Sequence, residues 1–224
     1  MAFFSDRVNA GKRLASALKD FSGKHGLVLA IPRGGVVVGY EIAKAINLPL
    51  DVIIPRKIGA PDNLELAVGA VAEDGTAILD EKLIRYLGVS HDYIREETER
   101  QKQEIQRRLK LYRQDTSYPN LKGLDVIVVD DGIATGSTMK AALASVKNRG
   151  AATITVAIPV GPPSTIEELE KMANQVVCLY TPEYFQAIGE FYSDFNQTSD
   201  EEVIRLLRES KHKSERKSTG MVMA

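Results

Sequence analysis

The chain has 224 residues, of which 44% are hydrophobic and 26% are charged. These proportions are typical of a globular protein rather than a disordered one. The formal net charge of −1 gives no general basis for binding nucleic acid. No apolar run approaches the length of a membrane span, and the first residues lack a signal-peptide pattern. We therefore expect one packed domain with no membrane or nucleic-acid partner.

Cys178 is the only cysteine in the sequence, so an intrachain disulfide bond is excluded. A reducing compartment is the simpler interpretation, and we expect a cytoplasmic protein. The apolar neighbours of Cys178 (QVVCLY) indicate a core residue rather than a nucleophile.

The first predicted elements are a helix, a strand and a second helix. Residues 5–20 favour a helix capped by Ser5 or Asp6, which packs at an edge and carries no chemistry. A short buried strand is predicted at 27–31 and a helix at 36–46. The intervening Pro32-Arg33-Gly34-Gly35 supplies a cation and two glycines that allow close backbone approach to a ligand. A plain strand-to-helix turn is the alternative interpretation.

A strand at 50–54 leads into Arg56 and Lys57, and adjacent cations at a strand end are usually solvated. Residues 58–66 contain the Gly, Pro and Asn of a loop, in which Glu65 is a candidate ligand contact. A hairpin follows, with strands at 67–73 and 76–79 around the turn dipeptide Asp74-Gly75.

Residues 90–113 predict a long, highly charged helix with a thin apolar stripe. Glu96/Arg100 and Glu104/Arg108 have the i,i+4 spacing of ion pairs. A solvated outer helix is the default interpretation, and an interface or mobile arm is the alternative. The basic residues near its end are balanced by acids and do not form a nucleic-acid patch.

The stretch 126–139 (VIVVDDGIATGSTM) has the clearest chemical meaning. An apolar run predicts a strand buried on both faces, and Asp130 and Asp131 sit where it ends. The glycines of the following loop allow backbone N–H groups to surround a phosphate, and the helix that begins near Ser137 adds its positive end. The two carboxylates should instead face hydroxyls, a cation or developing positive charge. A phosphorylated polyol fits both halves.

Other phosphate motifs fit this stretch poorly. A Walker loop requires G-x-x-x-x-G-K-[ST], whereas Ser137 stands in place of the lysine, and the G-x-G-x-x-G dinucleotide fingerprint is absent. An acidic pair also follows a strand in receiver domains, but near the domain start and without this Thr/Ser/Gly loop.

Further strands are predicted at 152–159 and 175–180, with a helix between them that starts at a capping box in 162–167. The alternation of strands and helices over 27–181 predicts an α/β fold with a doubly wound, mainly parallel sheet. Ligands of such sheets bind beyond the carboxyl ends of the strands, where every candidate loop falls.

The end of the chain combines an aromatic segment, a helix and a polar tail. Aromatic side chains gather at 184–195, and Ser199 to Glu202 forms a capping box for a helix that should end at Leu207. Residues 210–224 are polar and basic and are expected to be disordered. We expect one domain at 1–209, with a helical insertion at about 80–115 and a small hood at about 182–198.

Residues 126–139 strongly resemble the phosphoribosyl-diphosphate (PRPP) signature of the type I phosphoribosyltransferases. The resemblance extends over about residues 27–195 and implies that the loop binds the 5′-phosphate, while Asp130 and Asp131 hold the ribose hydroxyls. It places pyrophosphate at Arg33, Gly34 and Gly35, near a cis non-proline peptide at Arg33–Gly34 or a neighbouring bond. The implied phosphate-loop residues are Gly132, Ile133, Ala134, Thr135, Gly136, Ser137 and Thr138.

The resemblance assigns further roles outside the signature. Arg56 or Lys57 would reach the pyrophosphate, residues 58–66 would be the flexible loop that closes over the site, and Phe191 or Tyr192 would stack on the base. This loop lacks the lysine or arginine that some members carry. The implied cofactor is Mg²⁺, held through the substrate and by Asp130 or Asp131, and the implied assembly is a homodimer.

The expected function is transfer of the phosphoribosyl group from PRPP to a base, with Asp130, Asp131, Arg33 and Lys57 as the catalytic residues. Hypoxanthine/guanine-type members carry an acid where this chain has Ala134, which favours an adenine-like or non-purine acceptor. The alternatives are a PRPP-sensing regulator and a protein that binds or hydrolyses PRPP without transferase activity.

Overall fold

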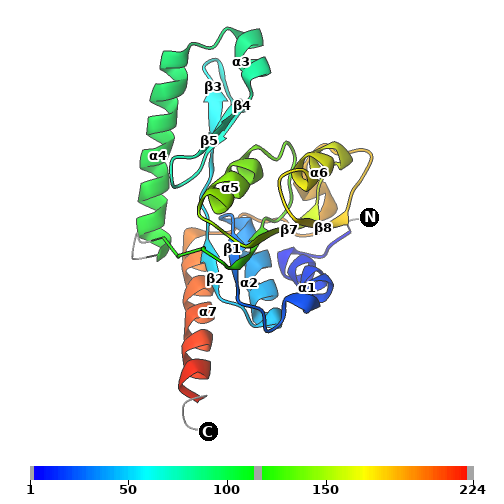
Figure 1. The fold of residues 1–224 in the computed structure, drawn as a ribbon. Coiled ribbons are helices and arrows are strands. Elements are labelled where there is room, and N and C mark those ends of the chain that lie inside the picture. The colour runs from blue at the N-terminus through cyan, green and yellow to red at the C-terminus, as the bar shows by residue number, and fades with distance from the viewer. Residues whose placement is uncertain (1–2, 114–117, 221–224) are drawn as a thin grey trace.

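The computed structural model describes residues 3–113 and 118–220. Its centre is a sheet of five parallel strands in the order β2–β1–β6–β7–β8 (Figure 1). The strands are β1 (Gly26–Ala30), β2 (Leu50–Val52), β6 (Asp125–Val129), β7 (Thr153–Val160) and β8 (Gln175–Tyr180). The predicted α/β fold with a mainly parallel sheet is confirmed.

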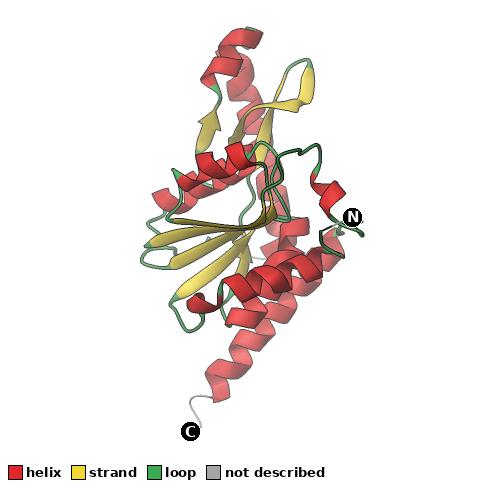
Figure 2. Ribbon diagram, turned by 90° about the vertical axis from the view of Figure 1, so that its right-hand side faces the viewer, coloured by secondary structure: helices red, strands yellow, loops and turns green. Residues whose placement is uncertain are grey.

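Helices cover both faces of this sheet (Figure 2). Alternate side chains of the buried strands point to opposite faces, so Val28 and Ile127 pack with one core cluster and Leu29 and Val128 with the other. One face is covered by α1 (Arg7–Ala17) and α2 (Gly34–Ile46), and the opposite face by α5 (Ser137–Asn148) and α6 (Pro163–Glu170). Two apolar layers therefore fix the positions of the strand ends.

A separate antiparallel sheet stands beside the parallel one and forms an arm with two helices (Figure 1). Its strands are β3 (Arg56–Ala60), β4 (Asn63–Val71) and β5 (Ala77–Leu79), followed by α3 (Glu81–Leu87) and α4 (His91–Arg113). The predicted hairpin around Asp74-Gly75 is confirmed as β4–β5. The predicted open loop at 58–66 is wrong, because these residues pair as the β3–β4 hairpin with a short turn. Closure of this segment over the site stays a prediction.

The long charged helix is confirmed as α4, but it is more than a solvated surface element. Its apolar stripe is buried, with Ile105 and Leu109 fully enclosed, and it packs on β3 and on α7 (Asp200–Gly220). The Glu104–Arg108 ion pair forms, whereas Arg100 pairs with Glu97 instead of Glu96. Burial of the stripe therefore fixes which charges of α4 face the rest of the molecule.

Buried charges join the end of α4 to the central sheet. The carboxylate of Glu73 lies 3.5 Å from an Arg113 nitrogen and 3.0 Å from an Arg149 nitrogen. Arg113 also donates to the Asp51 carboxylate at 2.9 Å. Burial raises the pKa of Glu73, and the two arginines act in the opposite direction.

Two short 3₁₀ turns complete the fold, at Lys19–Phe21 and Ile188–Phe191. Helix α6 starts at Pro163 with Pro162 as its N-cap and no side-chain cap, so the predicted capping box there is wrong. The Ser199 box is confirmed, since the Glu202 N–H donates to Oγ of Ser199.

Helix α7 continues to Gly220, beyond the predicted end and through part of the segment expected to be disordered, while 221–224 lie outside the described residues. No helix within the described part of the chain is both long and apolar enough to cross a membrane.

Candidate functional site

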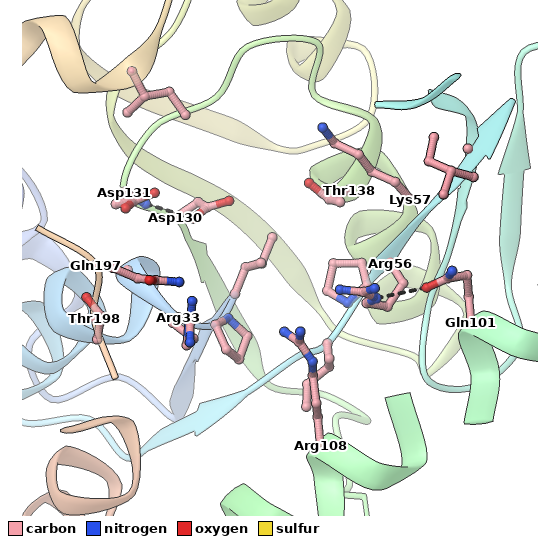
Figure 3. Close-up of a pocket in the computed structure, with 18 of the residues that line it drawn as sticks. Arg33, Arg56, Lys57, Gln101, Arg108, Asp130, Asp131, Thr138, Gln197 and Thr198 are labelled. Atoms are coloured by element: carbon pink, nitrogen blue, oxygen red, sulfur yellow. Dashed lines mark hydrogen bonds between the residues drawn. The ribbon is translucent and has the colours of Figure 1, made fainter. Parts of the chain in front are cut away.

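A pocket of about 740 Å³ opens beyond the carboxyl ends of the parallel strands, between the sheet and the arm (Figure 3). Six segments that are far apart in the sequence line it. They contribute Arg7 from α1, Arg33 and Gly34 after β1, Arg56 and Lys57 from β3, Glu97, Arg100, Gln101 and Arg108 from α4, Asp130, Asp131 and Thr138 after β6, and Ile188, Phe195, Gln197 and Thr198 near the C-terminal end.

The acidic pair lies where β6 ends, as predicted. Oδ1 of Asp130 accepts the backbone N–H of Asp131 at 2.8 Å. The pKa of Asp130 is raised well above its usual value. Burial is the largest cause, and the nearby charge of Asp131 is the second. Hydroxyl donors or a cation that bind this carboxylate therefore stabilise its ionised form strongly.

Arg7 belongs to this site, although the sequence predicted no chemistry for its helix. Its Nε donates to Oδ2 of Asp131 at 2.7 Å, and its Nη1 donates to the Asn196 carbonyl at 2.7 Å. The guanidinium carbon lies 3.8 Å from the ring centroid of Phe195. The expectation for α1 is corrected: its first residue ties the acidic pair to the segment after the last strand.

The loop after β1 packs directly on the acidic pair. Its Pro32–Arg33 peptide bond is cis, which agrees with the expectation of a cis bond at Arg33–Gly34 or a neighbouring position. A Cβ atom at Gly34 would lie 1.9 Å from Oδ2 of Asp131, and one at Gly35 would lie 3.0 Å from Cα of Asp130. The two glycines are therefore required for this contact. Gly34 also lines the pocket, whereas Gly35 is buried beneath it.

The loop after the acids divides into an anchored half and an exposed half. Ile133 is buried and its N–H donates to the Val160 carbonyl at 3.0 Å, while the Thr165 hydroxyl donates to the Ala134 carbonyl at 2.7 Å. Ile133 and Ala134 therefore anchor the loop to the rest of the fold. The side chain of Ile133 does not face the pocket.

The exposed half leads into the N-terminus of α5. Gly136 is the N-cap with φ of 72°, and no side chain caps the helix. The hydroxyl oxygens of Thr135 and Ser137 lie 3.1 Å apart, and Thr138 lines the pocket. The first N–H groups of a helix lack intrahelical acceptors, so this end can bind an anion. Gly132, with φ of 151°, leaves no room for a side chain, since a Cβ would lie 2.6 Å from Ile188.

The arm side of the pocket is rich in cations. Arg56 is half-buried and donates from Nε to Oε1 of Gln101 at 2.9 Å. Lys57 is exposed, and Arg33 lies on the other side of the pocket, 4.0 Å from Asp200 (Figure 3). Among the described residues, no group of three or more His, Cys, Asp or Glu side chains is arranged to hold a metal ion.

The model of the phosphoribosyl transferase domain family matches residues 6–196 of this chain. The chain belongs to this phosphoribosyltransferase family. The predicted recognition of the family from residues 126–139 is thereby confirmed.

Two similar proteins align with most of the chain. The crystal structure of TT1426 from Thermus thermophilus is 42% identical, has a TM-score of 0.79, and covers 93% of this chain and 99% of its own. "Putative phosphoribosyl transferase Rv0571c" of Mycobacterium tuberculosis is 43% identical over 209 residues, which are 92% of this chain and 47% of that protein. The chain thus spans about half the length of the curated relatives that it matches.

The aromatic side chains of this family member are arranged differently from the prediction. Tyr192 is buried, and its hydroxyl donates to the Asp131 carbonyl at 2.6 Å. Phe191 stacks on Phe185 with ring centroids 5.4 Å apart. Neither Phe191 nor Tyr192 lines the pocket, where Ile188 and Phe195 are found instead. The predicted base-stacking role is therefore not supported for those two residues.

Several features of the site were missed by the sequence reasoning. Arg7, Phe195 and Arg108 reach the pocket through tertiary contacts that no local motif marks. Phe195 lay within the aromatic segment, so its residue type was the available signal, whereas Arg7 and Arg108 carried none beyond charge. The side chain of Glu65, a candidate contact, lies outside the described residues.

Proposed function

We propose that the chain transfers the 5-phosphoribosyl group of PRPP to a ring nitrogen of a base and releases pyrophosphate. The proposal depends mainly on one observation, the acidic pair placed between two loops at one pocket. One loop presents the N-terminus of α5, and the other presents Arg33 and Gly34. An anion site, a hydroxyl-binding site and a second cationic site in this order match a sugar phosphorylated at both ends.

The proposed mechanism follows from these positions. Thr135, Ser137 and Thr138 bind the 5′-phosphate with the α5 N–H groups. Asp130 and Asp131 accept the ribose hydroxyls and favour the positive charge that develops as the bond from C1 to pyrophosphate stretches. The departing oxygen keeps the bonding electron pair, and Arg33 and Lys57 stabilise its charge. A ring nitrogen of the base then bonds to C1 through its lone pair, and the proton that the free base carried on its ring passes to water.

The chemistry of the donors fits a magnesium ion held mainly by the substrate. Mg²⁺ usually binds one or two carboxylates together with substrate phosphates and water, and the pocket offers two adjacent carboxylates rather than a cage of acids. Asp130 or Asp131 would hold the ion, which would supply charge neutralisation at the pyrophosphate and ribose oxygens.

The acceptor is proposed to be an adenine-like or non-purine base. Position 134 is an alanine whose carbonyl accepts the Thr165 hydroxyl, so it has no group that could transfer a proton to a ring nitrogen. Phe195 and Ile188, which line the pocket near Asp131, supply apolar surface for a planar ring.

A second candidate function is PRPP binding or sensing without transfer. The hairpin at residues 58–66 favours it, because this stretch contains no lysine or arginine that could act on the leaving group. A sensing protein needs the donor site alone, whereas a transferase also releases pyrophosphate.

Isothermal titration with Mg²⁺ and PRPP tests the donor site, on the wild type and on the double variant Asp131→Asn with Thr135→Ala. Micromolar binding that the double variant loses would support the proposal. A screen of bases for pyrophosphate release then separates the two candidates, since only a transferase releases it with a base. Absence of PRPP binding by the wild type would overturn both.

A further inference from the structure

Helix α4 forms one wall of the pocket, where a flexible loop was expected to close. Four of its side chains line the pocket: Glu97, Arg100, Gln101 and Arg108. The helix is held on β3 and α7 by fully buried apolar residues, including Ile105 and Leu109. The hydroxyl of Tyr112 also donates to Asp200, the residue 4.0 Å from Arg33. Arg108 is therefore carried by a fixed element.

The cations on this wall are incompletely neutralised. Arg56 has the neutral Gln101 as its hydrogen-bond partner, and no acidic oxygen lies within 4.0 Å of it among the described residues. Burial, and next the positive charge of Arg108, lower the pKa of Arg56. Two guanidinium groups that repel each other in a half-buried wall are stabilised when an anion binds between them.

Arg108 shares its acidic partner with another arginine. Glu104 accepts Nε of Arg108 at 2.8 Å and Nε of Arg107 at 2.8 Å. These two hydrogen bonds lower the Glu104 pKa to about 2, so one carboxylate serves two cations. The side chain of Arg108 is 25% exposed and lines the pocket, whereas that of Arg107 is 61% exposed and does not.

The positions of Arg56 and Arg108 relative to the third cation, Arg33, are visible in the close-up. The guanidinium group of Arg108 points from α4 toward the part of the pocket between Arg33 and Arg56 (Figure 3). Arg33, from the loop after β1 that the proposed function assigns to pyrophosphate, borders this part of the pocket, so this part lies toward the end of the donor that carries pyrophosphate.

We infer that Arg108, together with Arg56, forms an anion site on the arm that binds the pyrophosphate of PRPP as it departs, an inference that rests on the proposed function. Arg108 is then a residue that binds the leaving group, supplied by a fixed helix rather than by a closing loop. It transfers no proton: the bond from C1 to oxygen breaks, the oxygen keeps the electron pair, and the guanidinium groups neutralise the added charge.

Binding of inorganic pyrophosphate, PRPP and ribose 5-phosphate to Arg108→Gln, measured by isothermal titration with Mg²⁺ on the full chain, tests this inference. Arg107→Gln is the matched control, because it removes the same charge and the same contact with Glu104 outside the pocket. We expect Arg108→Gln to weaken pyrophosphate and PRPP binding about ten-fold or more and to leave ribose 5-phosphate unchanged. Arg107→Gln should bind all three as the wild type does.

The outcomes separate this inference from the proposed function. Wild-type protein that does not bind PRPP would overturn the proposed function, and the inference with it. Wild-type protein that binds PRPP, with equal pyrophosphate affinity in Arg108→Gln and Arg107→Gln, would overturn the inference alone. Thermal unfolding of both variants controls for loss of α4, and Arg108→Lys should restore part of the pyrophosphate affinity because it keeps the charge without the planar fork.

Discussion

Asp130 and Asp131 are adjacent acids that meet different surroundings. Asp131 has the guanidinium of Arg7 at 2.7 Å, whereas Asp130 faces the pocket and accepts a backbone N–H. Burial and the charge of Asp131 raise the Asp130 pKa, so in the folded chain its proton is bound more tightly than in the unfolded chain. An ionised Asp130 therefore lowers the stability of the folded protein when no ligand is bound.

Replacing Asp130 by Asn should expose this cost. A carboxyl whose pKa is raised on folding lowers stability as the pH rises above its unfolded value of about 3.9. We expect Asp130→Asn to have a higher Tm than the wild type at pH 7, with a difference that shrinks toward pH 4, and to bind PRPP more weakly. Thermal unfolding across this pH range measures the effect, and a Tm difference that does not vary with pH would contradict it.

The attachment of the arm to the sheet depends on buried charges rather than on apolar packing alone. Glu73 and Arg113 are almost fully buried, at 6% exposure each, and Arg149 completes the cluster. Both guanidinium groups also lie near the ring of Tyr118. The distance to the ring centroid is 5.6 Å from the guanidinium carbon of Arg113 and 5.1 Å from that of Arg149. Because α4 carries Arg108, this cluster also holds one wall of the pocket.

Arg113→Gln should destabilise the fold strongly, because it leaves the buried carboxylate of Glu73, whose pKa burial already raises, with one cation fewer. Removing one partner of a buried ion pair costs about 3–5 kcal/mol. Arg95→Gln makes the same chemical change in an exposed ion pair with Asp92, where less than about 1 kcal/mol is expected. Urea unfolding compares the two, and equal free energies of unfolding would show that the cluster does not anchor the arm.

The sequence was informative where local pattern determines structure. Apolar runs such as 126–129 located the parallel strands, and Gly, Thr and Ser residues located the loop before α5. The hairpin β3–β4 was missed because Pro61 and Asp62 form a short turn within paired strands, a pattern that also suits an open loop. Arg7 could not be placed, since its partner Asp131 lies 124 residues away and only the folded sheet brings them together.

The molecule as a whole combines a parallel sheet with an arm already in place. One wall of the pocket belongs to regular structure, α4 and β3, and the other consists of loops that begin where β1 and β6 end. The expected homodimer and cytoplasmic location stay predictions. The arrangement suggests that the donor enters an open pocket instead of ordering a long loop.

Hydrogen exchange tests this arrangement. We expect the amides of Ile105 and Leu109 in α4, and those paired between β3 and β4, to exchange slowly in the free chain, because they lie in hydrogen-bonded, buried elements. Addition of Mg²⁺ and PRPP should change their protection little and should protect the loop at 132–138 more. Rapid exchange of β3–β4 in the free chain, followed by strong protection on binding, would indicate a closing loop after all.

The contact between Gly34 and Asp131 also constrains how the family can diverge. A methyl group at position 34 would lie 1.9 Å from the Asp131 carboxylate and 2.5 Å from Nε of Arg7, so any larger residue displaces both charges together. We therefore expect mutations at positions 7, 34 and 131 to be epistatic. A lineage that loses the glycine must rebuild the acidic pair at the same time, and a lineage that abandons ribose binding is free to lose all three.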